Sequence, residues 1–193
     1  SQDRLEAHMT SSPPLAIRRV APADAAAIAA IYNHYVMRST ATFEVTPVSV
    51  ADMVRRIAGI AAAWPYHVGL CGDTVVGYCY AHPWKERQAF CHTLETTVYL
   101  HPEAVGHGYG LALMAHLIAD CRQRGYRMLI ACITGENAAS RALHARLGFT
   151  QASHFRAVGH KMGRWLDITD YQLDLTAGGA MRENSVPRPD ASK

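Results

Sequence analysis

Long apolar runs are missing from this sequence, and this argues against a membrane-spanning protein. A transmembrane helix needs about 20 apolar residues, whereas the two best stretches, Ala25–Met37 and Ile57–Gly72, are short and interrupted by polar residues or proline. The polar start of the chain also lacks the apolar segment of a signal peptide. We therefore expect a cytoplasmic protein without a membrane partner.

Residue patterns typical of metal sites are missing as well. The five cysteines include no CxxC pair, and their odd number does not suit a disulfide framework. The eleven histidines form neither HExxH nor HxxxH. We therefore expect reduced cysteines and no bound metal.

Charge of one sign is also scarce. Nineteen basic and sixteen acidic residues leave a net charge of +3, and the basic residues are scattered in small groups. This pattern does not indicate a nucleic-acid partner. With 49% hydrophobic and 18% charged residues, the chain has enough apolar material for a packed core.

The length of 193 residues suggests one domain with loose ends. Residues 1–14 are polar and aperiodic, and the stretch before Met9 resembles the remnant of an expression tag. Residues 176–193 contain a glycine pair and two prolines and are expected to form a disordered tail. The folded domain is therefore expected at residues 15–175.

Hydrophobic periodicity predicts an α/β domain with a mixed sheet and helices on its faces. Helices are expected to begin near Pro22, at Ser49 and after Gly110, and to cover Asn137–Leu147. Strands are expected at Leu15–Val20, Tyr66–Cys71, Thr74–Ala81, Phe90–Leu100, Met128–Ile133, Phe155–Val158 and Trp165–Leu175.

A glycine-rich segment, Val105–Gly110, stands between a predicted strand and a strongly apolar helix. Its sequence is V-G-H-G-Y-G, and glycines at every second position let a ligand approach the backbone. Successive N–H groups and the positive end of the helix dipole can then bind an anion, for which pyrophosphate is the expected ligand. The alternative is a flexible turn, because the spacing matches neither the Rossmann nor the P-loop motif.

The order of elements and this loop resemble those of the GCN5-related N-acetyltransferases, the GNAT superfamily. Gly108 and Gly110 match the last two fixed positions of the family motif Q/R-x-x-G-x-G/A, whereas Val105 departs from the first. The resemblance implies a mixed, mostly antiparallel sheet flanked by helices, with acetyl-CoA as cosubstrate. The residues implied in binding acetyl-CoA are Thr97, Val98, Tyr99, Leu100, Val105, Gly106, His107, Gly108, Tyr109 and Gly110.

Further segments resemble the phosphinothricin acetyltransferase group of this superfamily. The resemblance runs from Ile17 to Leu175 and implies acetylation of amino acids like phosphinothricin, methionine sulfoximine, methionine sulfone or arsinothricin, as a resistance function. Direct transfer is expected because no cysteine stands beside a convincing base, and a homodimer is expected as well. The matching segments are I-Y-N-H-Y at 31–35, S-T-A-T-F at 39–43, P-W-K-E-R-Q-A-F at 83–90, E-T-T-V-Y-L at 95–100 and G-H-K-M-G-R-W-L-D at 159–167.

The resemblance also implies catalytic roles. Glu95 matches the carboxylate that acts as base on the substrate amine, and the N–H of Val98 is expected beside the thioester carbonyl. His144 lies seven residues after Asn137, where many relatives carry a tyrosine that protonates the departing thiolate. Asn137 and Ser140 are expected to bind pantetheine. The alternatives are an exposed Glu95, a His144 that packs on its helix, and helix capping by Asn137 or Ser140.

The substrate amino acid is expected near the strand that carries Glu95. Lys85 and Arg87 follow a Pro-Trp pair and are expected to bind anionic oxygens, with Arg87 favoured because its guanidinium offers paired donors. Phe43 and Phe90 are expected to contact the substrate side chain. The alternatives are a solvated loop for the two cations and plain core for the two rings.

Some assignments stay open at this level. Lys161, Arg164 and Trp165 match a late loop of the group and either close the pocket or lie at a dimer interface. One rival function is acetylation of a polyamine or a peptide N-terminus, although the basic Lys85/Arg87 pair does not suit a polyamine. The other rival is a non-catalytic acyl-CoA sensor, against which the presence of both proposed catalytic residues argues.

Overall fold

The computed structural model describes residues 13–176, so most of the two predicted end segments, 1–14 and 176–193, lies outside the described residues. The helices are α1 Ala25–Arg38, α2 Val50–Ala61, α3 Tyr109–Gln123 and α4 Ala138–Arg146, with short 3-10 turns at Pro22–Asp24, Gln88–Phe90 and Pro102–Ala104. The strands are β1 Ala16–Arg19, β2 Tyr66–Cys71, β3 Thr74–Pro83, β4 Thr93–Leu100, β5 Met128–Thr134, β6 Thr150–Lys161 and β7 Arg164–Asp174.

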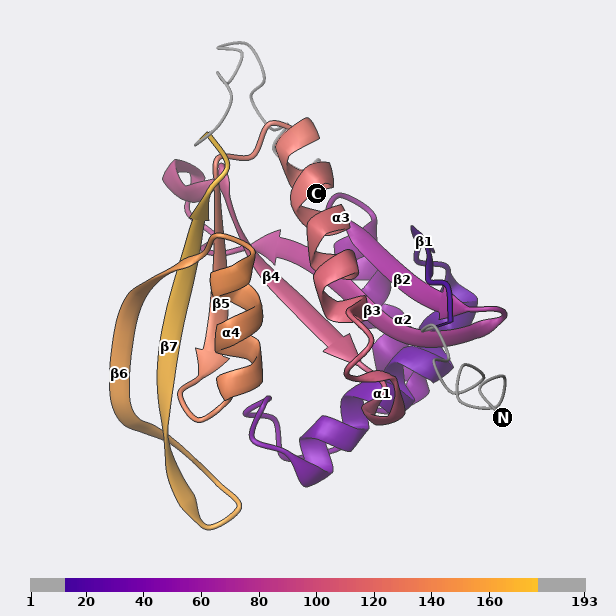
Figure 1. The fold of residues 1–193 in the computed structure, drawn as a ribbon, viewed down its shortest axis with the longest axis horizontal. Coiled ribbons are helices and arrows are strands. Elements are labelled where there is room, and N and C mark those ends of the chain that lie inside the picture. Colours follow the sequence, from indigo (N-terminus) through magenta and orange to yellow (C-terminus); the bar gives the residue numbers. More distant parts are fainter. Residues whose placement is uncertain (1–12, 177–193) are drawn as a thin grey trace, which may run out of the picture.

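All seven strands form one sheet in the order β1-β2-β3-β4-β5-β7-β6. Neighbouring strands are antiparallel except for β4 and β5, which run parallel (Figure 1). A parallel pair needs a crossover connection, and α3 lies in it. The predicted mixed, mostly antiparallel sheet flanked by helices is therefore confirmed.

Two apolar cores hold the helices to opposite faces of the sheet. On one face, Leu113 and Leu117 of α3 are buried with Leu94 of β4. On the other face, Ile28 of α1 is buried with Tyr78 of β3. In Figure 1, α3 and α4 lie in front of the sheet, and α1 and α2 lie behind it. One sheet can serve both cores because successive side chains of a strand point to opposite faces.

The two parallel strands separate after a short paired segment. Their register runs from Thr93 opposite Met128 to Glu95 opposite Ile130, although β4 continues to Leu100 and β5 to Thr134. Figure 1 shows the two strands diverging along their length. We call the wedge between the second half of β4 and the end of β5 the gap.

The predicted starts of the helices agree with the observed ones. α2 begins directly after Ser49, whose hydroxyl accepts a hydrogen bond from the N–H of Asp52 at 3.1 Å. α4 begins directly after Asn137, whose side chain caps the N–H of Ser140. Short polar side chains satisfy backbone donors that have no partner within the helix.

Two predicted strands were wrong in extent. The strand expected from Phe90 begins at Thr93, because residues 88–90 form a 3-10 turn. The strand expected at Phe155–Val158 is only the middle of β6, which has 12 residues. β6 is an edge strand with almost every residue exposed and with register shifts. Such a strand lacks the alternation of apolar and polar residues by which strands are recognised.

Candidate active site

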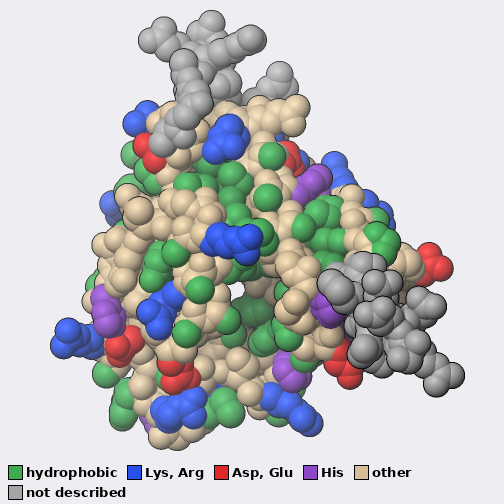
Figure 2. All heavy atoms as spheres, viewed as in Figure 1, with side chains coloured by type: hydrophobic (Ala, Val, Ile, Leu, Met, Phe, Trp, Pro, Cys, Tyr) green, Lys and Arg blue, Asp and Glu red, His purple; other side chains and the backbone are tan. Residues whose placement is uncertain are grey.

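A cavity of about 570 Å³ occupies the gap. It is lined by Thr96–Leu100 of β4, Ala131–Thr134 of β5, the loop from Val105, and one side of α4. In the space-filling view, a hollow with hydrophobic side chains inside it opens near the middle of the face shown (Figure 2). The separation of two strands therefore creates a cavity at the centre of the sheet.

The glycine-rich loop forms one edge of this cavity. Gly106 and Gly108 have φ angles of +85° and +79°, in the left-handed region that glycine tolerates best. A Cβ atom on either residue would meet no atom within 4 Å. Space beside the backbone is therefore open, and α3 begins here with no acidic residue in its first turn. Both features favour an anion at the N-terminus of α3.

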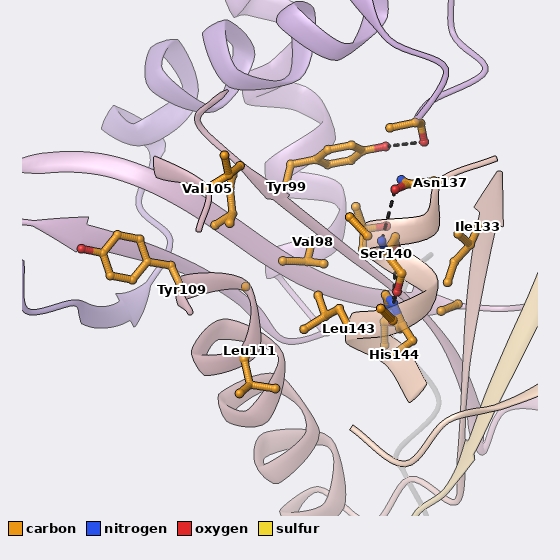
Figure 3. A pocket seen from close by; sticks show the side chains of 18 of the residues that line it. Val98, Tyr99, Val105, Tyr109, Leu111, Ile133, Asn137, Ser140, Leu143 and His144 are labelled. Carbon is orange, nitrogen blue, oxygen red and sulfur yellow. Dashed lines mark hydrogen bonds between the residues drawn. The ribbon is translucent and has the colours of Figure 1, made fainter. Parts of the chain in front are cut away.

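Two residues of the loop have side chains directed elsewhere. Tyr109 points away from the other labelled side chains of the cavity (Figure 3), and its hydroxyl donates to the Pro13 carbonyl at 2.6 Å. His107 stacks on the Tyr109 ring at 5.3 Å and is not among the lining residues. The predicted role of this loop therefore rests on its backbone.

The backbone of β4 offers polar groups to the gap. The Thr93 carbonyl accepts from the Trp84 N–H, and the His101 N–H donates to Val76, so odd-numbered positions direct their polar groups to β3. Successive residues of a strand direct N–H and C=O groups to opposite edges. The Thr96 C=O and both backbone groups of Val98 are therefore directed to the β5 side, beyond the last paired position.

His144 of α4 lines the cavity together with Asn137 and Ser140 (Figure 3). Its ring is buried, with an exposed fraction of 4%. Nδ1 donates to the Ser140 carbonyl at 2.7 Å, and the ring contacts Phe149 edge-on. Burial lowers the pKa of His144, although the hydrogen bond to Ser140 acts in the opposite direction. The ring is therefore held as a neutral imidazole, with Nε2 as the nitrogen left for a ligand.

Glu95 lies at the inner end of the gap, next to the first lining residue, Thr96. Its carboxylate Oε2 is 3.3 Å from Nε2 of His82, its partner across β3 and β4. Both side chains are about one-third exposed, at 31% and 33%. The hydrogen bond that protonated His82 donates to Glu95 raises the pKa of His82 above its usual value. The predicted base is thus a half-buried carboxylate with a histidine partner.

The side chains predicted to bind the amino acid lie outside this cavity. Lys85 and Arg87 are exposed in the connection between β3 and β4, and the Lys85 ammonium lies 4.8 Å from the Trp84 ring centroid. Phe90 makes an edge contact with Trp84. Phe43 packs against Gly159 of β6, where a Cβ would come within 2.5 Å of its ring.

The late segment around the β6–β7 turn combines buried and exposed side chains. Lys161 is buried, and its ammonium donates to the carbonyls of Tyr35 and Thr42 at 3.2 and 2.9 Å. Arg164 pairs with Glu136 at 2.7 Å. Trp165 is 70% exposed. Lys161 therefore ties the hairpin to the end of α1 and the following loop, while Trp165 points outward.

Sequence reasoning missed the far side of the cavity and the partner of Glu95. The β5 residues were predicted only as a strand, because a continuous apolar run, M-L-I-A-C-I, does not indicate which of its residues line a pocket. His82 gave no signal, because it becomes a neighbour of Glu95 only through strand register. The lining residues that were not predicted are Tyr35, Ala41, Thr96, Leu111, Ala131, Cys132, Ile133, Thr134, Ala139, Ala142, Leu143 and Arg146.

The split sheet, with a glycine-rich loop at the start of its crossover helix, defines a class of transferase. The profile of the acetyltransferase (GNAT) domain matches residues 17–169, and this chain belongs to that family. The resemblance predicted from the loop motif and the order of elements is confirmed.

Relatives of the chain narrow the class further. A phosphinothricin N-acetyltransferase of Alcaligenes faecalis is 42% identical over 164 residues, covering 84% of this chain and 83% of the relative. An L-methionine sulfoximine/L-methionine sulfone acetyltransferase of Salmonella typhimurium is 38% identical over 165 residues, covering 83% and 95%. A phosphinothricin acetyltransferase of the GNAT superfamily from Sinorhizobium meliloti, solved in complex with acetyl-CoA, has a TM-score of 0.84 and 38% identity, covering 90% and 96%. The chain is an acyltransferase.

Two further kinds of feature are absent from the part of the chain that the structure describes. Within residues 13–176, no group of three or more His, Cys, Asp or Glu side chains is arranged to hold a metal ion. No helix of the same segment is long and apolar enough to cross a membrane.

Proposed function

We propose that this acyltransferase moves the acetyl group of acetyl-CoA to the α-amine of an amino acid with a tetrahedral head, of the kind represented by phosphinothricin, methionine sulfoximine and arsinothricin. The observation that carries the proposal is the position of Glu95 at the inner end of the gap, beside the cavity. Relatives that are named for phosphinothricin and methionine sulfoximine support the substrate class.

The residues around the cavity fit acetyl-CoA, which supplies the thioester when it is bound. The open backbone at Gly106 and Gly108 and the N-terminus of α3 would hold its pyrophosphate. Asn137 and Ser140 would hold the pantetheine arm. The Asn137 Oδ1 already caps the Ser140 N–H at 3.2 Å, so the side-chain nitrogen of Asn137 is the group that remains for the ligand. Capping and binding are therefore compatible in one residue.

Glu95 would take a proton from the substrate ammonium, because only the free amine can attack a thioester. The Val98 N–H, directed to the gap, would stabilise the negative charge that develops on the carbonyl oxygen. His144 would protonate the thiolate. Since burial lowers the pKa of His144, its proton-donating form is disfavoured at neutral pH, and this step draws on a minor population.

Arg87 would bind an anionic oxygen pair of the amino acid, supported by Lys85, with Phe43 and Phe90 beside the side chain. Arg87 has the planar fork that suits paired oxygens, and its exposed loop directly precedes β4. A charge-assisted hydrogen bond contributes roughly 1.5–3 kcal/mol, so Arg87→Ala should raise the amino-acid KM about 10- to 150-fold. The KM for acetyl-CoA should stay unchanged.

We also propose that the protein forms a homodimer. Four large apolar side chains of the β6–β7 hairpin are more than half exposed, at 53, 54, 51 and 70%, which is unusual for surface that meets only water. They are Phe155, Val158, Met162 and Trp165.

A thiol-release assay tests the proposed function. Phosphinothricin, methionine sulfoximine, methionine sulfone and arsinothricin should be acetylated faster than spermidine or a peptide amine. Glu95→Gln keeps the shape but removes the base, and it should lower kcat about 10²–10⁴-fold at pH 7, with partial recovery at high pH. Preference for spermidine or a peptide amine would overturn the substrate class, and binding of acetyl-CoA without turnover would favour a sensor.

A further inference from the structure

The side chain of His82 is fixed in an orientation that suits proton transfer. His82 and Glu95 are direct partners in the antiparallel register of β3 and β4, so their side chains lie on the same face of the sheet. The imidazole Nδ1 lies 3.0 Å from the Pro83 carbonyl, and it donates there because a carbonyl can only accept. Nε2 is thereby directed to the Glu95 Oε2 atom at 3.3 Å.

A carboxylate alone is poorly matched to its task here. A free carboxyl has a pKa of about 4.3 and a free amino group one of about 8, so a carboxylate without a partner holds the proton of an amine only briefly. A proton acceptor works best when its pKa lies near the working pH. An imidazole beside the carboxylate meets that condition.

Resting on the proposed role of Glu95, we propose that His82 is a proton-relay residue, which receives through Glu95 the proton that the substrate amine gives up. The N–H bond of the ammonium breaks as an O–H bond forms on Glu95. That O–H bond then breaks as an N–H bond forms on Nε2, which leaves a carboxylate beside an imidazolium. The imidazolium releases the proton to water, which its 33% exposure permits. His82 acts through Glu95 and is in that sense a positioning residue.

Among the groups around the pair, Glu95 has the largest influence on the pKa of His82. Tyr80 faces His82 with ring centroids 5.9 Å apart, and burial raises its pKa, so it stays neutral. Cys132 of β5 also interacts with Glu95, and its surroundings raise its pKa to about 12, so it too stays neutral. On the neighbouring strand β7, the charged residue Asp170 faces Cys132. The remaining charges, Glu44 and Arg56, face Tyr80 and form an ion pair with each other at 2.8 Å.

The relay predicts the direction in which the reaction rate changes with pH. His82 can accept a proton only when it is neutral, and its pKa lies above 6.5 because of Glu95. The kcat/KM for the amino acid should therefore rise with pH through a limb above pH 6.5. Titration of the substrate amine adds the same limb to every variant, so the comparison between variants isolates the contribution of His82.

The decisive variants are His82→Ala and, with more of the side chain kept, His82→Gln. We expect kcat/KM for the amino acid to fall about tenfold, less than for loss of a direct base, and the His82 limb to disappear. Added imidazole should restore the rate of His82→Ala, and the affinity for acetyl-CoA should not change. His154→Ala is the matched control, because His154 also pairs with a carboxylate, Asp167, at 2.7 Å. Strand register places His154 on the opposite face from Glu95.

The outcomes separate this proposal from the proposed function. A fully active Glu95→Gln enzyme would overturn the base and the relay together. An impaired Glu95→Gln enzyme beside a His82→Gln enzyme with the wild-type rate and pH profile would overturn the relay alone. A His82→Ala defect that imidazole does not restore would also overturn the relay. Thermal melting of each variant checks that the rates refer to folded protein.

Discussion

At the scale of single residues, the environment of His144 constrains the chemistry that this side chain can perform. Its Nδ1 proton is committed to the Ser140 carbonyl, and burial favours the neutral ring. Proton donation to a thiolate therefore competes with desolvation of the imidazolium. We expect a modest catalytic contribution, smaller than that of Glu95.

Replacement of His144 by phenylalanine tests this balance. His144→Phe keeps an aromatic ring against Phe149 and should lower kcat, with little change in acetyl-CoA affinity.

The same variant should also change how the stability of the fold depends on pH in acid. Because the folded-state pKa of His144 lies below 6.5, the wild type is fully stabilised above the unfolded pKa and loses stability as pH falls through the folded value. Urea unfolding of both proteins between pH 7 and pH 5 measures the loss, which His144→Phe should lack. A variant with normal kcat and only a changed melting temperature would assign His144 to packing.

Residues of the site were predictable to different degrees. Glu95, His144 and the glycine-rich loop could be predicted because each stands in a segment of the chain that resembles the family. His82 and Thr134 could not, because they reach the site through strand register, which depends on pairings between distant segments. Lys161 was noticed, but only the structure shows its ammonium bound to the Tyr35 and Thr42 carbonyls.

At the scale of elements, the loop before α3 can be separated from other turns by a matched pair of variants. Gly108 and Gly72 both have positive φ, at +79° and +59°, and a Cβ at either meets nothing within 4 Å. A left-handed non-glycine residue costs roughly 1–2 kcal/mol, so Gly108→Val and Gly72→Val should lose similar stability. Only Gly108→Val should weaken acetyl-CoA binding, about 10- to 150-fold if one charge-assisted contact is lost. Calorimetric titration measures this, and equal affinity in the two folded variants would contradict the anion site.

The turn between β1 and α1 is held by one buried carboxylate. Asp24 accepts from both Arg18 guanidinium nitrogens at 2.8 and 2.9 Å and from the Ala21 N–H at 2.8 Å. Asp24→Asn should cost about 1.5 kcal/mol at pH 7, the low end for a charged hydrogen bond, because Arg18 is 46% exposed.

The pH dependence of that cost has a definite sign. The hydrogen bond with Arg18 lowers the pKa of Asp24, so its stabilisation is present above the unfolded pKa of about 3.9 and is lost as pH falls through the folded value. Urea unfolding at pH 7 and pH 3 should show the difference between wild type and Asp24→Asn shrinking in acid. A constant difference would show that packing, not charge, dominates.

Most elements were predictable from the sequence, and the two exceptions lack a local signal for different reasons. Strands and helices that bury one face could be recognised by their apolar period, as for α2 with Met53 and Ile57. β6 could not be delimited, because an exposed edge strand with two register shifts carries no such period. Phe90, the last residue of the turn at Gln88–Phe90, was predicted as the start of the next strand because nothing in the composition separates it from that strand.

At the scale of the whole molecule, the exposed apolar side chains of the β6–β7 hairpin predict self-association. Sedimentation should give twice the chain mass of 21.1 kDa at micromolar concentration, and Trp165→Ser should shift the protein toward monomer. Val50→Ser is the control, since Val50 is 50% exposed but lies on α2. A wild-type monomer at these concentrations would contradict the proposal.

The gap between β4 and β5 has a consequence for amide hydrogen exchange. The middle of a sheet is ordinarily the slowest-exchanging part of a domain, because both edges of each strand are paired. Here the Val98 N–H is directed into the gap, while the neighbouring Thr97 and Tyr99 direct theirs to β3. The free enzyme should therefore show fast and slow exchange alternating along one central strand. A ligand arm that runs through the gap and accepts the Val98 hydrogen would remove the alternation. The central strand would therefore be protected from exchange along its whole length only when the cosubstrate is bound.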